Sequence, residues 1–310
     1  MVTWPLTARA EDTPRVYRIF WVSAGSEPDP LLDGFREGLR RLGYVEGKNL
    51  VFEQHYAAGD PAALRRMASE LKPDNVDLAV SSGPATRAMK SVTDVPVLFA
   101  LSGDPVELGI VKSLAQPGGN FTGRTFLSLE VAGKRVELLK AVFPKSRTLA
   151  VLSNTDHPGE QSEWRATLRA AETLGIEPIY VHFNGACELD QALQTVVQAH
   201  ADAMLVFPEP ATLMHRAKLA ELAISQRLPS MFGWSEYCDA GGLMSYGANQ
   251  RAIYVGLADY ADRILRGEKP SNLPVEQPTK FELVVNLKTA KALGVETALN
   301  PILFRAKVIE

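Results

Sequence analysis

The chain has 310 residues, 46% of them hydrophobic, which is enough to fill the cores of two domains of ordinary size. The formal net charge is −3 and the basic residues are scattered, so there is no basic stripe that would follow nucleic-acid phosphates, and we expect no nucleic-acid partner. No run of about 18 apolar residues occurs, so we expect no membrane-spanning helix.

The first residues, MVTWPLTARAED, contain Ala8-Arg9-Ala10, a small-x-small pattern typical of the end of a secretory signal peptide. The basic and apolar regions that precede such a site in a complete signal are missing. We interpret residues 1–13 either as the remnant of a signal peptide, with a mature start near Glu11, or as a disordered tail. No cysteine lies near this point, so a lipoprotein-type anchor is not indicated.

Apolar runs of strand length alternate with helical periodicity along the first half of the chain. The run 16–22 is followed by a small-residue loop and by a helix at 30–42 whose apolar residues fall three or four apart. Asp60-Pro61 is typical of a helix N-terminus. Further strands are expected at 76–80 and 95–101, and further helices at 84–92 and 106–115.

The same alternation starts again after Gly118-Gly119-Asn120, which indicates a second lobe similar to the first. Strands are expected at 148–152, 178–183, 203–207 and 230–232, and helices at 131–142, 161–174, 189–199, 213–226 and 249–266. Such alternation predicts parallel sheets with helices on both faces.

Four blocks carry a resemblance: GYVEGKNL (43–50), SGDPVELGIVKSLAQPGGNFTG (102–123), GGLMSYG (241–247) and QPTKFELVVNLKTAKALG (277–294). In this order they resemble the substrate-binding proteins of one family of bacterial ABC importers, which includes binders of tryptophan and other aromatic amino acids. The resemblance runs from about Val16 to the C-terminus. It implies a periplasmic binding protein type I-like fold, in which two Rossmann-like α/β lobes with parallel sheets are joined by three crossover segments.

We place the three crossings at 123–127, 246–247 and 277–281, because extended segments flanked by Gly and Pro can absorb hinge motion. Lobe 1 then comprises residues 14–123 plus 247–277, and lobe 2 comprises residues 124–246 plus 278–310. The alternative is a single Rossmann-like enzyme domain with a C-terminal extension. It is disfavoured because GxGxxG does not follow the first strand and no P-loop motif occurs.

Ligands of open parallel sheets bind at the carboxyl ends of the strands. The candidate ligand-binding residues in such positions are Ser23, Ser26, Ser82, Gly83, Ser102, Asp104, Asn154, Glu209, Trp234 and Tyr246.

Two of these positions offer opposite charges to a ligand. Ser82 and Gly83 precede a predicted helix, where hydroxyl and backbone N–H groups with the helix dipole could hold a carboxylate, unless Ser82 only caps the helix. Asp104 ends a strongly apolar strand and could accept hydrogen bonds from an ammonium or hydroxyl group. The family resemblance favours Asp104, because a TDP or GDP turn recurs there. The alternative is an N-cap before Pro105.

The remaining candidates come from lobe 2 and the second crossing. Trp234 and Tyr246, together with Phe232, offer flat faces that could stack on a ligand side chain, although each could equally be part of the core. Asn154 and Glu209 end two strands and offer polar groups to the cleft, or are ordinary loop residues.

The sequence offers little for catalysis or metal binding. The five histidines show no HExxH spacing and no GxSxG motif occurs. We interpret Asp156-His157 as a solvated loop, and we assign no catalytic residue, metal or cofactor. Cys187 and Cys238 fall in different loops outside any CxxC spacing, so we expect two free thiols, although one disulfide is possible on sequence alone.

These observations favour an exported, periplasmic solute-binding protein. We expect a monomer that closes on a small carboxylate ligand, an amino acid by the resemblance and with aromatic ones among the candidates, and that hands it to an ABC permease. The first alternative is the effector-binding domain of a LacI-like transcription regulator, for which the fifteen residues before Val16 leave little room for a DNA-binding motif. The second is an α/β enzyme using Asp104 or the Asp156-His157 pair.

Overall fold

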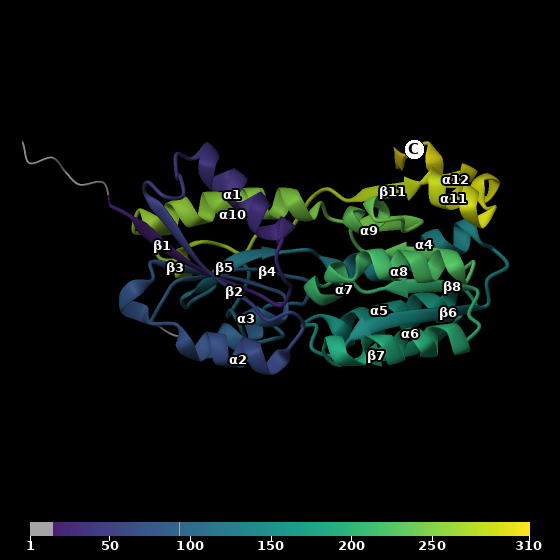
Figure 1. The fold of residues 1–310 in the computed structure, drawn as a ribbon, viewed down its shortest axis with the longest axis horizontal. Coiled ribbons are helices and arrows are strands. Elements are labelled where there is room, and N and C mark those ends of the chain that lie inside the picture. Colours follow the sequence, from purple (N-terminus) through teal and green to yellow (C-terminus); the bar gives the residue numbers. More distant parts are fainter. Residues whose placement is uncertain (1–14, 93) are drawn as a thin grey trace, which may run out of the picture.

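The structure is a computed structural model that describes residues 15–92 and 94–310. In this part of the chain two α/β lobes lie end to end along the long axis of the molecule (Figure 1). The cleavage-site pattern Ala8-Arg9-Ala10 lies outside the described residues. The two-lobed α/β architecture predicted from the sequence is confirmed.

The first lobe is built on a five-stranded parallel sheet in the order β2-β1-β3-β4-β5. Its strands are β1 (Tyr17–Ser23), β2 (Leu50–Tyr56), β3 (Leu78–Ser82), β4 (Val97–Leu101) and β5 (Phe121–Thr125). Its helices are α1 (Pro30–Arg41), α2 (Pro61–Glu70), α3 (Pro84–Ala88) and α10 (Gln250–Leu265), with 3-10 turns η1 (Pro73–Asn75), η2 (Met89–Ser91) and η4 (Pro270–Asn272). β3 and β4 are buried along their whole length, because helices cover both faces of the sheet.

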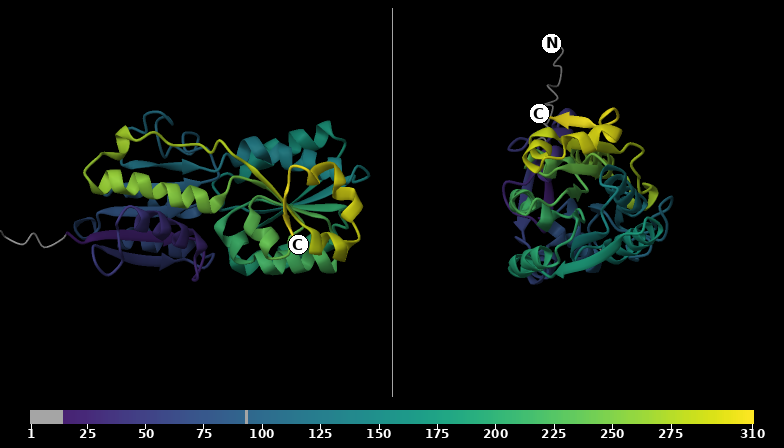
Figure 2. Two further views of the ribbon diagram at one scale, coloured as in Figure 1. Left: turned by 90° about the horizontal axis from the view of Figure 1, so that it is seen from above. Right: turned by 90° about the vertical axis from the view of Figure 1, so that its right-hand side faces the viewer.

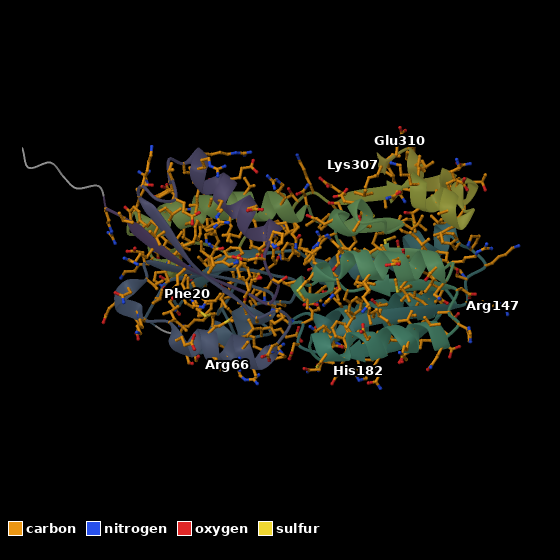
Figure 3. The ribbon with its side chains drawn as sticks, in the orientation of Figure 1. Phe20, Arg66, Arg147, His182, Lys307 and Glu310 are labelled. Carbon is orange, nitrogen blue, oxygen red and sulfur yellow. The ribbon has the colours of Figure 1, made fainter. Side chains whose placement is uncertain are left out.

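The cap predicted for α2 shows how the sequence sets the element ends. Asp60 accepts a hydrogen bond from the N–H of Ala62 at 2.8 Å and Pro61 occupies the first helical position. On the opposite face of the sheet α1 packs against α10 (Figures 1 and 2). Phe20 on β1 is fully buried within the first lobe, whereas Arg66 of α2 lies at the periphery (Figure 3).

The second lobe is built on a seven-stranded sheet in the order β12-β11-β10-β9-β8-β6-β7. Its strands are β6 (Thr148–Asn154), β7 (Glu177–Phe183), β8 (Ala203–Val206), β9 (Ser230–Phe232), β10 (Met244–Gly247), β11 (Glu282–Asn286) and β12 (Lys307–Ile309). Its helices are α4 (Ser128–Val142), α5 (Glu160–Thr173), α6 (Leu189–Gln198), α7 (Pro210–Met214), α8 (Arg216–Ser225), α9 (Ser235–Asp239), α11 (Leu287–Leu293) and α12 (Asn300–Leu303), with 3-10 turns η3 (Ala186–Glu188) and η5 (Glu296–Leu299).

The chain passes between the two sheets three times. It leaves the first sheet after β5 to form α4, leaves the second sheet after β10 to form α10, and returns to the second sheet as β11 (Figure 2). Because β10 leads out of the second lobe and β11 leads into it, these two neighbours are antiparallel, whereas the other neighbouring strands are parallel. The predicted parallel sheets are therefore confirmed, with one antiparallel pair at this junction.

The segment before the third passage runs along the outer side of β5. The N–H of Thr125 donates to the carbonyl of Glu276 at 2.9 Å, and the N–H of Glu276 donates to the carbonyl of Gly123 at 3.0 Å. The hydroxyl of Thr122 donates to the carbonyl of Leu273 at 2.6 Å. Residues 273–276 therefore belong to the first lobe, and the chain is free of this strand only from residue 277 onward.

Three predicted helices differ from the structure. Residues 106–115 form turns, because Gly109 takes a left-handed φ of 62°, which a right-handed helix cannot continue. The helix expected at 84–92 ends as an α-helix at Ala88 and continues as a 3-10 turn. The helix expected at 213–226 is divided at His215 between α7 and α8.

Candidate ligand-binding site

The carboxyl ends of strands from both sheets meet where the two lobes face each other. The loop after β8 lies against the first lobe: the hydroxyl of Ser102 donates to the carbonyl of Pro208 at 3.3 Å. Gly83 packs on Pro210 so closely that a Cβ at residue 83 would lie 2.9 Å from the ring. We call this contact region the seam, and it comprises residues 82–83, 102–103, 154–158 and 208–210.

The lobes are closed on each other at the seam. A Cβ at Gly103 would lie 2.9 Å from the carbonyl carbon of Pro158, which is closer than real Cβ contacts allow. Farther out, Arg165 of α5 donates to Glu107 of the first lobe at 3.1 Å, and the hydroxyl of Ser162 donates to the same carboxylate at 3.1 Å. Backbone and side-chain contacts therefore connect the two lobes directly.

Glu209 is a buried carboxylate at the centre of the seam, with 1% of its surface exposed. It caps α7, because one oxygen accepts from the N–H of Ala211 at 3.0 Å and the other from the N–H of Thr212 at 2.6 Å. Burial raises the pKa of the Glu209 carboxyl, while these N–H groups oppose the rise. The side chain of Asn154 also hydrogen-bonds to the carboxylate, and His157 acts on it electrostatically. A carboxylate has about four acceptor sites, so Glu209 retains capacity for a further donor.

Ser82 does not cap a helix, so that interpretation was wrong. The residue preceding α3 is Gly83, whose φ of 52° lies in the left-handed region and which has no side-chain cap. The helix is also only five residues long, which weakens the predicted contribution of its dipole. The Ser82 hydroxyl is buried near the Tyr254 hydroxyl, but it makes no hydrogen bond of normal geometry among the described residues. A ligand is one group that could satisfy it.

One crevice of about 250 Å³ opens between the lobes beside β1. Ser23 and Ser26, two of the candidate residues, both line it, and the hydroxyl of Ser23 accepts from the N–H of Gly25 at 3.1 Å. Apolar groups from both lobes complete the first crevice, among them Leu31, Leu213 and Met214.

A second crevice, also of about 250 Å³, lies between the lobes beside β4 and β6. Its lining is mostly polar and includes Asp104 and Arg87 from the first lobe and His157 from the second. Asp104 is exposed, and its Oδ1 accepts from the N–H of Val106 at 2.7 Å. Asp104 therefore caps a turn at the rim of the second crevice, and not the helix that the sequence predicted.

The two candidate aromatic residues belong to different groups of rings. Trp234 is 2% exposed and lies 5.2 Å, centroid to centroid, from Phe126 in the first passage between the sheets. Tyr246 is half-buried and lies 6.1 Å from Phe281 in the third passage. Phe232 stacks on Tyr237 at 4.9 Å within the second lobe. The structure therefore does not bring Trp234 and Tyr246 together as one wall of a pocket.

The family model for ABC transporter substrate binding proteins matches residues 22–308 of the chain. This chain belongs to that family. The substrate-binding protein is also 26% identical over 271 residues to a tyrosine-binding protein of Clostridioides difficile (strain R20291), a match that covers 86% of this chain and 77% of the relative.

Solved structures are similar to this substrate-binding protein over nearly its whole length. A conserved domain protein from Vibrio cholerae O1 biovar El Tor has a TM-score of 0.86 at 27% identity, covering 96% of this chain and 100% of the other. An ABC domain from Streptococcus pneumonia in complex with L-Trp has a TM-score of 0.83 at 26% identity, covering 94% and 100%. The ligand-free, open structure of a substrate-binding protein from Clostridium difficile scores 0.64 at 25% identity, covering 95% and 99%.

These similarities confirm the periplasmic binding protein type I-like fold that the resemblance implied. At nearly equal identity, the TM-score is higher against the L-Trp complex than against the open, ligand-free structure. This difference agrees with the contacts across the seam, which place the substrate-binding protein in a closed arrangement.

The interpretation of Asp156-His157 as a solvated loop was wrong for His157. The His157 imidazole of this substrate-binding protein is 1% exposed, and its Nε2 lies 2.8 Å from a carboxylate oxygen of Glu163. The sequence did not indicate this contact. His157 and Glu163 are six positions apart across the junction of a loop and α5, and this spacing matches no known metal-ligand or catalytic motif. The presence of a histidine right after a strand end was the available signal.

Residues 15–92 and 94–310 of the substrate-binding protein contain both of its cysteines. Both cysteines are free thiols: Cys187 is exposed and Cys238 is buried. No group of three or more His, Cys, Asp or Glu side chains in this part of the chain is arranged to hold a metal ion. Among the described residues, no helix has the length and apolar character needed to cross a membrane.

Proposed function

We propose that this substrate-binding protein works in the periplasm as a monomer, binds an amino acid in the seam, and delivers it to a membrane-embedded ABC permease. The observation that supports an amino acid is the buried Glu209 carboxylate, which both lobes enclose. A relative named for tyrosine binding and a similar structure with L-Trp bound support the same ligand class. The family match over residues 22–308 favours this function over the regulator and enzyme alternatives.

Glu209 is the proposed acceptor for the ammonium group of the ligand. Its burial makes ionisation costly in the free protein, and a ligand cation in direct contact would offset that cost. Charge-assisted hydrogen bonds of this type are about twice as strong as neutral ones. With Glu209 in this role, Asp104 is a residue of the rim of the second crevice, where its Oδ1 already accepts from a turn N–H.

Ser82 is the proposed donor to the carboxylate of the ligand. Its hydroxyl is buried and makes no hydrogen bond within the described part of the chain, and the next residue, Gly83, packs on Pro210 of the other lobe. Ser102 is a second hydroxyl at the same edge of the sheet, although it donates to Pro208 in the closed arrangement. Two hydroxyls at the ends of adjacent strands suit a carboxylate without requiring a cationic side chain.

The side chain of the ligand would extend into the first crevice. That space of about 250 Å³ is lined by Leu31 from the first lobe and by Leu213 and Met214 from the second. A methionine adapts readily to aromatic faces, which suits a pocket for a large side chain. Trp234, packed on Phe126, would border the ligand on the side of the crossing segments.

Closure would follow from ligand binding by a population shift. Glu209 belongs to the second lobe and Ser82 to the first, so a ligand that contacts both gains its full set of contacts in the closed form alone. That differential affinity stabilises the closed population, which is the form a permease would distinguish from the empty one.

A thermal-shift screen tests the ligand class. The protein is refolded to remove bound solute and compared with L-Tyr, L-Trp and L-Leu, and with matched analogues lacking either the ammonium or the carboxylate. Ligand at 100 times Kd adds about 2.7 kcal/mol to the stability of the folded form, which raises Tm by a few degrees. We expect stabilisation by intact amino acids and loss of the effect in both analogues. If no amino acid stabilises the protein, the ligand class is wrong, whereas the fold and the family stand.

Glu209→Gln gives the residue-level test. We expect its affinity for the amino acid to fall at least about 30-fold, because removing one partner of a buried charged pair costs about 2 kcal/mol or more. Glu236→Gln is the matched control: burial also raises the pKa of Glu236, but this residue lies in α9 near Asp239, away from the seam. Equal affinities of the two variants would remove Glu209 from the site.

A further inference from the structure

Resting on the proposed function, we propose that His157 is a ligand-contacting residue: its Nδ1 accepts a hydrogen bond from the ammonium group that Glu209 also binds. A buried chain of Glu163 and Arg135 fixes its ring and connects it to the second passage between the lobes. The ammonium would then meet three acceptor atoms, the two carboxylate oxygens of Glu209 and His157 Nδ1, which matches the three N–H groups of a primary ammonium.

The chain behind His157 is continuous and buried. Nε2 of His157 lies 2.8 Å from Oε1 of Glu163, and Oε2 of Glu163 lies 3.4 Å from the guanidinium of Arg135. The side chains of these three residues are at most 1% exposed. Nε of Arg135 in turn donates to the carbonyl of Tyr246 at 2.8 Å. Each link therefore lies in the interior of the second lobe, where water does not compete for it.

The chemistry of Glu163 decides which nitrogen of His157 faces the cleft. Oε2 of Glu163 lies against the Arg135 guanidinium, a group that can only donate, and a carboxylate in that contact accepts hydrogen bonds. Burial lowers the pKa of Arg135, and the charge of Glu163 opposes that fall. Nε2 must then carry the proton that is donated to Glu163. In the neutral ring this leaves Nδ1 as the nitrogen without a proton.

Nδ1 of His157 has no partner among the described residues although the ring is 1% exposed. A buried polar atom without a hydrogen bond is costly, and native proteins seldom retain one without a use for it. His157 lines the second crevice and is near enough to Glu209 to act on it electrostatically, so a ligand ammonium that reaches both residues would satisfy both. A neutral Nδ1 is an acceptor, which selects a donor such as ammonium over a carboxylate.

The far end of the chain lies at the hinge side of the lobe. Tyr246 is on β10, the strand by which the chain leaves the second lobe toward α10. Arg135 therefore connects Glu163, which orients His157, to the backbone of β10, where the second passage begins. Glu163 and Arg135 are positioning residues in this arrangement, since neither contacts the ligand.

Two substitutions of His157 separate ligand contact from packing. Glutamine places its amide near the position of Nε2 and can still donate to Glu163, whereas asparagine places its amide near Nδ1 and leaves Glu163 without that donor. We expect His157→Gln to keep the apo Tm and to bind the amino acid about 10- to 100-fold more weakly, the loss for one hydrogen bond to a charged group. We expect His157→Asn to lose Tm and to retain more of the affinity. The reverse order would overturn the proposal.

A measurement on the unsubstituted protein covers the case in which neither variant folds. Long-range 1H–15N NMR of the histidine ring reports which nitrogen is protonated. We expect the Nε2–H form with an unprotonated Nδ1 whose resonance shifts when the amino acid binds. A protonated Nδ1 in the complex, or a Nδ1 resonance unaffected by ligand, would refute the contact.

Methylation of the ligand nitrogen gives an independent count of acceptors. If three acceptors surround the ammonium, affinity falls at each step from the primary amine to the N-methyl and N,N-dimethyl forms. Tight binding of the dimethylated ligand by the unsubstituted protein would contradict three-acceptor recognition while leaving amino-acid binding intact. Failure of every amino acid to bind would instead overturn the proposed ligand class itself.

Discussion

The guanidinium of Arg165 in the second lobe donates to the carboxylate of Glu107 in the first lobe at 3.1 Å. Both side chains are about half exposed, at 52% and 55%. The pair therefore forms a link across the closed lobes that water can screen, and it lies beyond the buried contacts of the seam.

Removing this link should make closure slightly less favourable. For Glu107→Gln we expect ligand affinity to fall by at most about fivefold, since an exposed ion pair contributes about 0.2–1 kcal/mol, with no change in apo Tm. Titration calorimetry at low and high salt measures the effect, which should shrink as salt rises. Asp190→Asn is the control, because Asp190 pairs with Lys218 within the second lobe. A loss beyond tenfold would mean that Glu107 contacts the ligand.

Gly103→Ala should prevent closure without unfolding either lobe. The new Cβ would lie 2.9 Å from the backbone of Pro158, a contact that exists when the lobes are together and disappears when they separate. We expect a larger radius of gyration by small-angle X-ray scattering in the presence of ligand, strongly reduced affinity and an unchanged apo Tm. Gly119→Ala is the control, because a Cβ there has no neighbour within 4 Å. Normal closure by Gly103→Ala would show that the seam is looser than described.

The affinity of the amino acid should fall on the acid side of the pH range. Burial raises the pKa of Glu209, and protonation removes the negative charge that binds the ammonium group. As pH drops through that raised pKa, Kd should rise about tenfold per pH unit, the slope for uptake of one proton. Calorimetry across the acid range measures the slope, and Glu209→Gln should abolish it. Retention of the slope by Glu209→Gln would assign it to another group.

The Glu209 carboxyl also makes the folding stability of the ligand-free protein depend on pH. Because its pKa is raised on folding, ionising Glu209 lowers the stability of the folded form. That cost is absent below the pKa of the unfolded chain and fully present above the raised pKa. Ligand should therefore stabilise the protein most where Glu209 is ionised.

The two cysteines should differ in reactivity toward an alkylating reagent. Cys187 is exposed, whereas Cys238 is buried and its desolvation raises the pKa of the thiol to about 12. Because the thiolate is the reactive form, iodoacetamide should label Cys187 in the native protein and Cys238 only after unfolding. Mass spectrometry of digested samples distinguishes the two, with Cys187→Ser as the control. Equal labelling of both in the native state would contradict the burial of Cys238.

Local patterns in the sequence predicted most of the strands and helix ends correctly. Asp60 caps the helix that follows it, as its pattern predicted, because capping depends on residues two or three positions away. The prediction of a helix at 106–115 was wrong, also for a local reason. Gly109 adopts a left-handed φ, which composition alone does not reveal.

The site was harder to predict because its geometry depends on distant parts of the chain. Ser23, Ser26 and Glu209 were predicted from their positions at strand ends, and in the structure the two serines line the first crevice and Glu209 is buried at the seam, while their role in binding stays a prediction. His157 was missed, because its burial depends on Arg135 and Glu163, which two packed helices bring together. No local pattern encodes such a contact.

The segment at residues 273–276 protects the first sheet as well as shaping the path of the chain. Without it, β5 would present unpaired N–H and C=O groups at a sheet edge, a surface to which a strand of another molecule can add. The same lobe also needs α10, so its last elements come from residues 250–276, and the second lobe needs β11 and β12 after them. Until nearly the whole chain has been synthesised, the first lobe therefore lacks α10 and the segment that covers β5, and the second lobe lacks β11 and β12. A chain truncated before residue 250 would expose an aggregation-prone edge at β5.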